Sequence, residues 1–218
     1  MRILLLGATG RTGRKLMEQA LARSHCVHAL VRDPAKMTTR HHELRLFTGS
    51  PLDKDCLQKA MQGCEAILSA LNISRTSDWP WARLRTPVNF LSTVMQYLIE
   101  LAPQQGINRI IFISAWGVAE TRQDIPGWFR WFIENSNIRY PYADHERQEN
   151  LVQQSSLDWT GIRAAGLTHF KNKKQVLVSF HNQPPPRLTI SRNNLASFML
   201  DTLEQNLYSR QLPVVSEK

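Results

Sequence analysis

The fold is decided by the stretch Arg2-Ile-Leu-Leu-Leu-Gly-Ala-Thr-Gly-Arg-Thr-Gly13. A short apolar run ends at Gly7, and Gly10 and Gly13 complete a glycine-rich turn. From position 16 to Arg23, apolar residues recur at helical spacing. The stretch therefore predicts a strand, a tight turn and a helix.

Strand and helix patterns continue to alternate along the chain. Expected strands are 26–31, 44–47, 66–71, 109–113 and 159–163, and expected helices are 53–62, 87–102 and about 142–154. This alternation predicts an α/β fold, a Rossmann-type doubly wound parallel sheet in three α/β/α layers. A strand at 175–180, three prolines at 184–186 and a helix at 192–204 predict that residues 165–218 form a small C-terminal elaboration on the substrate side.

Length and composition limit the class of protein. The 218 residues, 42% hydrophobic and 21% charged, fit one globular domain over 1–218 and exclude collagen-like and disordered chains. The apolar runs are too short for a membrane span or a signal-peptide core, so we expect a cytoplasmic protein with no membrane partner. Cys26, Cys56 and Cys64 lack metal-site spacing, so no metal is expected.

The chain is basic, with 27 Lys and Arg against 18 Asp and Glu and a formal charge of +9. This charge predicts attraction to anions, which include nucleic acid, lipid headgroups and phosphorylated cofactors. The one tight cluster, Lys171, Lys173 and Lys174, is interpreted as a solvated surface. No nucleic-acid-binding motif accompanies it, so nucleic acid is an unlikely partner.

The glycine-rich turn predicts a dinucleotide site. Glycines let the backbone approach a pyrophosphate, and a helix N-terminus supplies N–H donors and partial positive charge. A turn that only packs helix on strand is the alternative. Arg32 ends the second strand, where an Arg accommodates the 2′-phosphate of NADP, so NADPH is favoured and NADH is the alternative. Lys36 would add a second cation, while Asp33 and Pro34 form a helix start.

Several motifs together resemble a known family, the atypical short-chain dehydrogenases/reductases. Within it the resemblance is to the NAD(P)H-binding, NmrA-like group that includes the biliverdin-IXβ/flavin reductases. The matching motifs are Gly7–Gly13, Val31-Arg32-Asp33, Ile113-Ser114-Ala115, Asp144-His145, Ser156-Leu157-Asp158-Trp159, Ile190-Ser191 and Leu195-Ala196. The chain departs from the family pattern at Ser50, where an Asp is common, at Arg163-Ala164 in place of Arg-Pro, and at Asn194 in place of Asp.

The turn and the resemblance together imply a set of cofactor contacts. The expected residues are Gly7, Thr9, Gly10, Arg11, Thr12, Gly13, Arg32, Lys36, Ser50, Ala70, Leu71 and Ser114. The resemblance places Ser114, at the end of the fifth strand, beside the nicotinamide. A hydroxyl that only satisfies strand-end backbone is the alternative for Ser114.

The reaction cannot follow the usual Tyr-x-x-x-Lys route, in which a lysine lies four residues after the catalytic tyrosine. The residue at that position is Asp144 for Tyr140 and Glu146 for Tyr142. Hydride transfer to a conjugated acceptor, such as a flavin, a quinone or a tetrapyrrole-like molecule, demands less of the protein. Ser114 and His145 are the catalytic candidates. His145 lies on one helical face with Tyr142, Glu149 and Val152, and a structural histidine is the alternative.

Two aromatic segments, Trp79-Pro-Trp81 and Trp128–Phe132, are expected near the carboxyl edge of the sheet. They would stack on a substrate, or pack a lid or a dimer contact. An interfacial membrane helix is the weakest reading, because segment 128–132 is short and carries little positive charge.

The sequence thus predicts an NADPH-preferring reductase that passes hydride to a conjugated acceptor. A protein that senses NADP(H) and acts through a protein partner without turnover is the alternative. The acceptor's identity and the choice between monomer and homodimer stay open.

Overall fold

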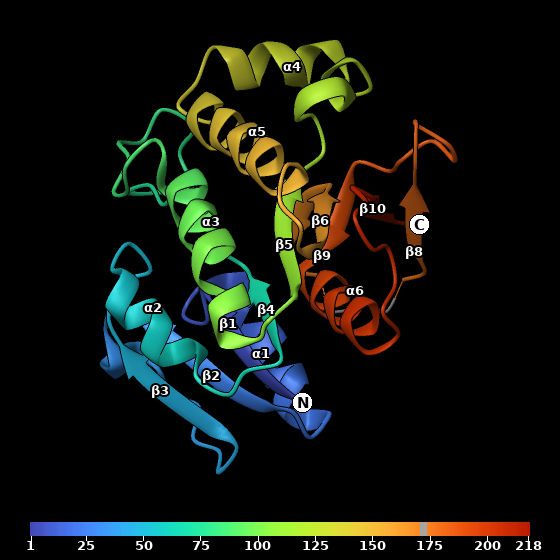
Figure 1. Cartoon of the computed structure of the whole chain (residues 1–218). Coiled ribbons are helices and arrows are strands. Elements are labelled where there is room, and N and C mark those ends of the chain that lie inside the picture. Colours follow the sequence, from blue (N-terminus) through green and yellow to red (C-terminus); the bar gives the residue numbers. More distant parts are fainter. Residues whose placement is uncertain (171–173) are drawn as a thin grey trace.

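The computed structural model describes residues 1–170 and 174–218, which form a mostly parallel sheet with helices on both faces (Figure 1). The main sheet has the order β3-β2-β1-β4-β5-β6-β10-β8. Its strands are β1 (Arg2–Leu6), β2 (Cys26–Val31), β3 (Leu44–Thr48), β4 (Ala66–Ser69), β5 (Arg109–Ala115), β6 (Asp158–Ala164), β8 (Val176–Ser179) and β10 (Val214–Glu217). A small second sheet pairs β7 (Gly166–Thr168) with β9 (Thr189–Ser191). The prediction of a Rossmann-type parallel sheet is confirmed.

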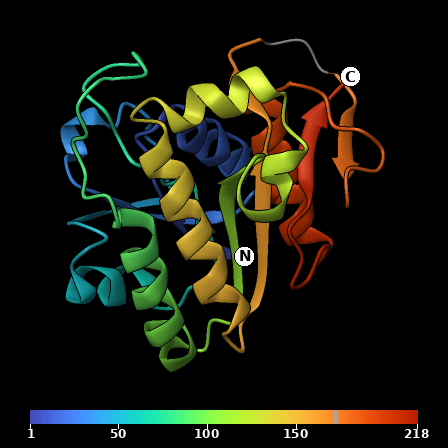
Figure 2. The ribbon, with the colours of Figure 1, turned by 90° about the horizontal axis from the view of Figure 1, so that it is seen from above.

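Helices cover the two faces of the sheet in separate layers. One layer holds α2 (Lys54–Met61), α3 (Phe90–Leu101) and α5 (Arg139–Gln153), of which α3 and α5 lie side by side (Figure 2). The other holds α1 (Arg11–Ala22) and α6 (Arg192–Glu204), which pack together. Helix α4 (Gly127–Glu134), which precedes α5 in the chain, crosses above α5 (Figure 1). Short 3-10 helices are η1 (Pro34–Lys36), η2 (Pro103–Gln105) and η3 (Ala119–Gln123).

Burial on both faces explains why the strands read as continuous apolar runs. In β1, Ile3 and Leu5 pack in the core beneath α1 and α6, whereas Leu4 and Leu6 pack beneath α2, α3 and α5. Successive side chains point to opposite faces of a strand, so a strand covered on both sides needs apolar residues at every position.

The C-terminal region is joined closely to the main sheet. Strand β10 pairs parallel to β6, and β8 pairs antiparallel to β10.

Helix α4 was not predicted, and α5 begins at Arg139, three residues before the predicted start. Proline 141 fits there because it lies in the first helical turn, where its missing N–H has no intrahelical acceptor. In the predicted basic cluster, Lys171 and Lys173 lie outside the described residues.

The carboxyl ends of the parallel strands lie at one edge of the sheet. The turn after β1 and the segments after β2, β4 and β5 therefore open on the same side, where ligands of such sheets bind. Among residues 1–170 and 174–218, no helix combines the length and apolar character that crossing a bilayer requires.

Candidate functional site

The glycine-rich turn brings helix α1 close against the end of β1. Gly7 has φ +85°, and a methyl group there would lie 2.7 Å from the carbonyl oxygen of Ala70. A methyl group at Gly13 would lie 2.0 Å from the carbonyl oxygen of Gly7. At Gly10 the nearest atom would be 3.2 Å away. Gly7 and Gly13 are therefore needed for close packing, and Gly10 leaves one side of the turn open.

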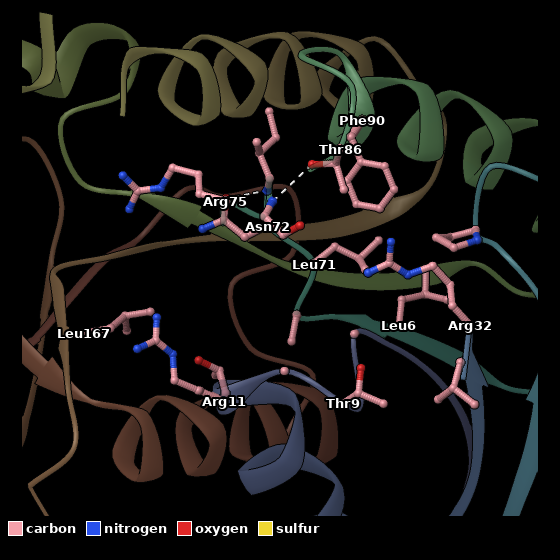
Figure 3. Close-up of a pocket in the computed structure, with 18 of the residues that line it drawn as sticks. Leu6, Thr9, Arg11, Arg32, Leu71, Asn72, Arg75, Thr86, Phe90 and Leu167 are labelled. Atoms are coloured by element: carbon pink, nitrogen blue, oxygen red, sulfur yellow. Dashed lines mark hydrogen bonds between the residues drawn. The ribbon is translucent and has the colours of Figure 1, made fainter. Parts of the chain in front are cut away.

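The N-terminus of α1 faces a groove and is free to receive an anion. Gly10 caps the helix in an extended conformation with no side-chain hydrogen bond, and the first turn has no acidic residue. The groove has a volume of about 370 Å³ and is lined by eight of the predicted cofactor residues (Figure 3). These are Gly7, Thr9, Gly10, Arg11, Thr12, Arg32, Ala70 and Leu71. Unused helix N–H donors beside a groove fit a pyrophosphate.

Arg32 stands at the far end of this groove from Arg11 and Arg75 (Figure 3). Its side chain is exposed and forms no ion pair with any residue in the described ranges. Asp33 instead accepts a hydrogen bond from the Ala35 N–H at 3.1 Å and begins η1, the structural role predicted for it. An unpartnered guanidinium at the end of the second strand fits a 2′-phosphate.

Four predicted cofactor residues lie outside the groove lining. Lys36 forms an ion pair with Asp33 at 3.3 Å, and the Ser50 hydroxyl accepts a hydrogen bond from the Leu52 N–H. Gly13 packs behind the turn, and Ser114 lines a neighbouring cavity. The structure therefore brings together the turn, Arg32 and the end of β4, but not Lys36 or Ser50.

Sequence reasoning missed three charged residues that line the groove: Arg75, Asp78 and Arg192. Asp78 holds Arg11 through two hydrogen bonds of 2.8 Å, and this ion pair lowers the pKa of Asp78. Burial, with the nearby charge of Arg11, lowers the pKa of Arg192. The Arg192 Nη1 atom is buried without a hydrogen-bond partner among the described residues. Only Arg192 carried a sequence signal, because it directly follows the matched Ile190-Ser191 motif.

A second, largely apolar cavity of about 560 Å³ adjoins the groove. Ile113, Ala164 and Leu167 line it from the sheet side, and Trp128 and Phe129 line it from α4. The groove and the cavity share five lining residues, Asn72, Ile73, Arg75, Leu167 and Arg192. A ligand in the groove would therefore lie next to a ligand in the apolar cavity.

Ser114 lines this cavity and is fixed from behind by a buried charge network. Its Oγ donates a hydrogen bond of 2.6 Å to Glu149, which accepts two more from Arg163 at 3.1 and 2.8 Å. Arg163 also pairs with Glu120, whose pKa it lowers. Because Glu149 takes the one hydroxyl proton of Ser114, Ser114 can only accept a hydrogen bond from a ligand.

His145 lines the same cavity from α5. Its side chain is 2% exposed, and burial lowers its pKa to about 4. Its Nδ1 atom has no hydrogen-bond partner among the described residues. The neighbouring Asp144 faces α3, where it accepts hydrogen bonds of 2.6 Å from the Leu91 N–H and the Ser92 hydroxyl. His145 is therefore neutral at pH 7 and is not paired with Asp144.

The described residues also limit other chemistry. Burial raises the pKa of Tyr142, the phenol nearest the cavity, and no lysine follows it at four residues. In the described ranges, no three His, Cys, Asp or Glu side chains gather as a metal site would need, and Cys26, Cys56 and Cys64 are free thiols. The residues in place fit a dinucleotide and an apolar second ligand.

Comparison with known proteins supports this assignment. A family model described as NAD(P)H-binding matches residues 7–206. The chain is 30% identical over 169 residues to an oxidoreductase of Pestalotiopsis microspora. This alignment covers 71% of this chain and 62% of that protein. It spans about three fifths of the length of the curated relatives it matches.

Two solved structures have the same fold at low sequence identity. A short-chain dehydrogenase/reductase from Veillonella parvula in complex with NADP has a TM-score of 0.80 at 18% identity, covering 99% of this chain and 94% of that one. ChuY, an anaerobillin reductase from Escherichia coli O157:H7, has a TM-score of 0.81 at 18% identity, covering 100% and 97%. With the family match over most of its length, the chain belongs to the NAD(P)H-binding family.

Proposed function

We propose that this protein is an NADPH-dependent reductase that transfers hydride to a conjugated acceptor, with a flavin or a quinone as the acceptor class. The observation that carries the proposal is the adjacency of the two cavities: the groove that fits a dinucleotide shares five lining residues with a large apolar cavity. Hydride transfer requires two ligands in contact, and this arrangement supports such contact.

The cofactor would lie along the groove, with its pyrophosphate at the N-terminus of α1 and its 2′-phosphate at Arg32. Arg11 and Arg192 stand where they could add positive charge to the pyrophosphate end. The bound cofactor supplies the hydride, and the protein supplies binding, orientation and exclusion of water. The unpartnered guanidinium of Arg32 supports a preference for NADPH over NADH.

The state of Ser114 and His145 supports a conjugated acceptor over an isolated carbonyl. The Ser114 hydroxyl already donates its hydrogen bond to Glu149, and His145 is neutral near pH 7. Neither group is therefore placed as a ready acid, which reduction of an isolated carbonyl requires. A flavin or quinone delocalises the negative charge that hydride delivers and takes its proton from water. Ser114 would then act as a hydrogen-bond acceptor that orients the nicotinamide amide.

The test is NADPH consumption, followed by absorbance, with FMN, riboflavin and a small water-soluble quinone offered in turn and NADH compared in parallel. Saturable turnover that prefers NADPH supports the proposal. NADPH binding without turnover on any of the three acceptors would overturn it and favour a protein that senses NADP(H) through a partner. Titration calorimetry with NADPH on the same samples separates loss of turnover from loss of cofactor binding.

A further inference from the structure

Four tryptophans in two short segments are exposed, and one of them, Trp128, also lines the apolar cavity. Trp79, Trp81, Trp128 and Trp131 are 65%, 46%, 67% and 62% exposed. Tryptophan is normally well buried in folded domains, so four exposed side chains in two short segments require an explanation. We call this surface, with Phe129 and Phe132, the aromatic face.

The fold joins the aromatic face from two segments that are far apart in sequence. The Trp79 and Trp81 rings lie 5.4 Å apart, and Trp81 meets the Phe132 ring at 6.0 Å. The Trp81 indole N–H donates to the Asn135 carbonyl oxygen at 2.8 Å. Asn137 in turn donates to the Trp81 carbonyl oxygen at 2.8 Å. The loop that follows β4 is therefore fastened to the C-terminal end of α4, and the two segments make one surface.

Exposed arginines adjoin the Trp79–Trp81 segment. Arg83 and Arg85 follow Trp81 in the loop after β4 and are both exposed, whereas Arg130 and Arg139 line a separate pocket with Glu134 and Glu146. The carboxylates nearest in sequence to the two segments are paired, Asp78 with Arg11 and Glu134 with Arg122. The face therefore combines exposed indoles with arginines and neutralised carboxylates, the composition typical of proteins that bind anionic lipid surfaces.

We propose that the aromatic face docks this protein on an anionic lipid surface, with the tryptophans at the level of the headgroups. The sequence argued against such a role because segment 128–132 alone is short and has a single arginine. The fold changes the argument, since it adds Trp79, Trp81 and the arginines of the preceding loop to the same surface.

The cavity explains why lipid fits better than a protein partner. Trp128 and Phe129 belong to the aromatic face and also line the apolar cavity. A face resting on lipid would open this cavity toward molecules dissolved in the membrane. This part rests on the proposed function, and it narrows the acceptor class to lipid-soluble conjugated molecules such as quinones.

The experiment is sedimentation of the full chain with vesicles of phosphatidylcholine alone or with an equal part of phosphatidylglycerol. Vesicles containing brominated lipids serve as a second readout, because bromine quenches tryptophan only where the ring reaches the bilayer. We expect binding and quenching with the anionic vesicles and little of either with phosphatidylcholine alone. Absence of binding to anionic vesicles would overturn the proposal.

The decisive variants leave the cavity lining intact. Arg83→Glu should weaken vesicle binding by at least about fivefold, the effect of one cationic side chain near an anionic membrane. Trp79→Ala combined with Trp131→Ala should lower the quenching to about half, because Trp81 and Trp128 remain on the face. Arg45→Glu is the matched control, because Arg45 is exposed on the edge strand β3, away from α4 (Figure 1). An equal loss with Arg45→Glu would reduce the binding to net charge and refute the assignment to this face.

Two further measurements separate this inference from the proposed function. Turnover with a water-soluble quinone, without vesicles, should be unchanged in the Trp79 and Trp131 double variant, because neither residue lines the cavity or the groove. Failure of turnover in the wild type would refute the proposed function and leave vesicle binding to be judged separately. If size-exclusion chromatography shows a dimer that the double variant breaks, a second copy covers the face and the lipid assignment is wrong.

Discussion

The buried network behind Ser114 makes a sharp prediction about stability. Glu149 and Arg163 are 1% and 2% exposed in their side chains, and Glu149 accepts three hydrogen bonds from Ser114 and Arg163. Glu149→Gln keeps the shape and one acceptor oxygen but removes the charge. Arg163 would then be a buried cation whose remaining charged partner, Glu120, is 66% exposed.

Loss of one partner of a buried ion pair costs about 3–5 kcal/mol, and Glu120 should hold the cost near the lower end. A loss of about 3 kcal/mol in a domain of this size lowers Tm by about 6–12 °C. Urea denaturation and a thermal melt, both without ligand, measure these two quantities. Ser114 can still donate to the amide oxygen, so its orientation should survive.

The matched control is Glu120→Gln, which removes the exposed partner of the same arginine. Because solvent screens Glu120 and Glu149 still pairs with Arg163, the loss should stay below about 1 kcal/mol. Equal losses for the two variants, or a loss below 1 kcal/mol for Glu149→Gln, would refute the argument that Glu149 balances the buried charge.

Three further predictions concern the cofactor groove and the histidine. Arg32→Glu should weaken NADPH binding about tenfold to a hundredfold and leave NADH nearly unchanged, whereas Lys36→Ala should change neither much; calorimetry with both cofactors decides, and equal loss of both would contradict the 2′-phosphate assignment. Gly13→Ala should destabilise the fold by about 1–3 kcal/mol in urea, whereas Gly10→Ala should fold normally and lose NADPH affinity; a stable Gly13→Ala protein would show that the turn can relax. Burial lowers the pKa of His145 to about 4, so the unfolded chain binds more protons than the folded chain between pH 6.5 and 4, and the free energy of unfolding falls as the pH falls through that range. His145→Phe should reduce this loss of stability by about 3 kcal/mol. An unchanged pH profile of stability would show that the histidine is not buried as a neutral group.

Short-range patterns were enough to predict the sheet and its glycine turn. The strand at 2–6, the glycines at 7, 10 and 13 and the helix that follows are local features, and each is set by residues within about ten positions. The cap formed by Asp33 was predictable for the same reason, since Asp33 and Pro34 adjoin the helix that they begin. Local sequence therefore predicts elements and their ends.

The charge network behind Ser114 could be predicted only in part. Helical spacing placed Glu149 on the face of His145, but Arg163 reaches Glu149 only because β6 pairs with β5 beside α5. Glu120 joins from a further segment, 43 residues before Arg163. Such contacts depend on the tertiary arrangement, which no local pattern encodes.

Loop positions were the least predictable part of the site. Asp78 binds Arg11 from a loop 67 residues away in sequence, and no hydrophobic periodicity predicts that contact. Helix α4 did carry a signal, because Pro126 directly precedes Gly127 and Ile133 is its buried apolar residue. Its aromatic residues fit stacking or packing in a loop as well as in a helix, so they do not specify the helix.

The shared lining of the groove and the apolar cavity has a consequence for inhibitor design. Because Asn72, Ile73, Arg75, Leu167 and Arg192 line both spaces, the two spaces lie within one side chain of each other. A single molecule that joins a nicotinamide-like ring to a flat apolar ring system by a short linker could fill both at once. Such a compound would gain affinity from the high effective concentration of its second half once the first is bound. It would also compete with the cofactor and with the acceptor, an inhibition pattern that neither half alone would give.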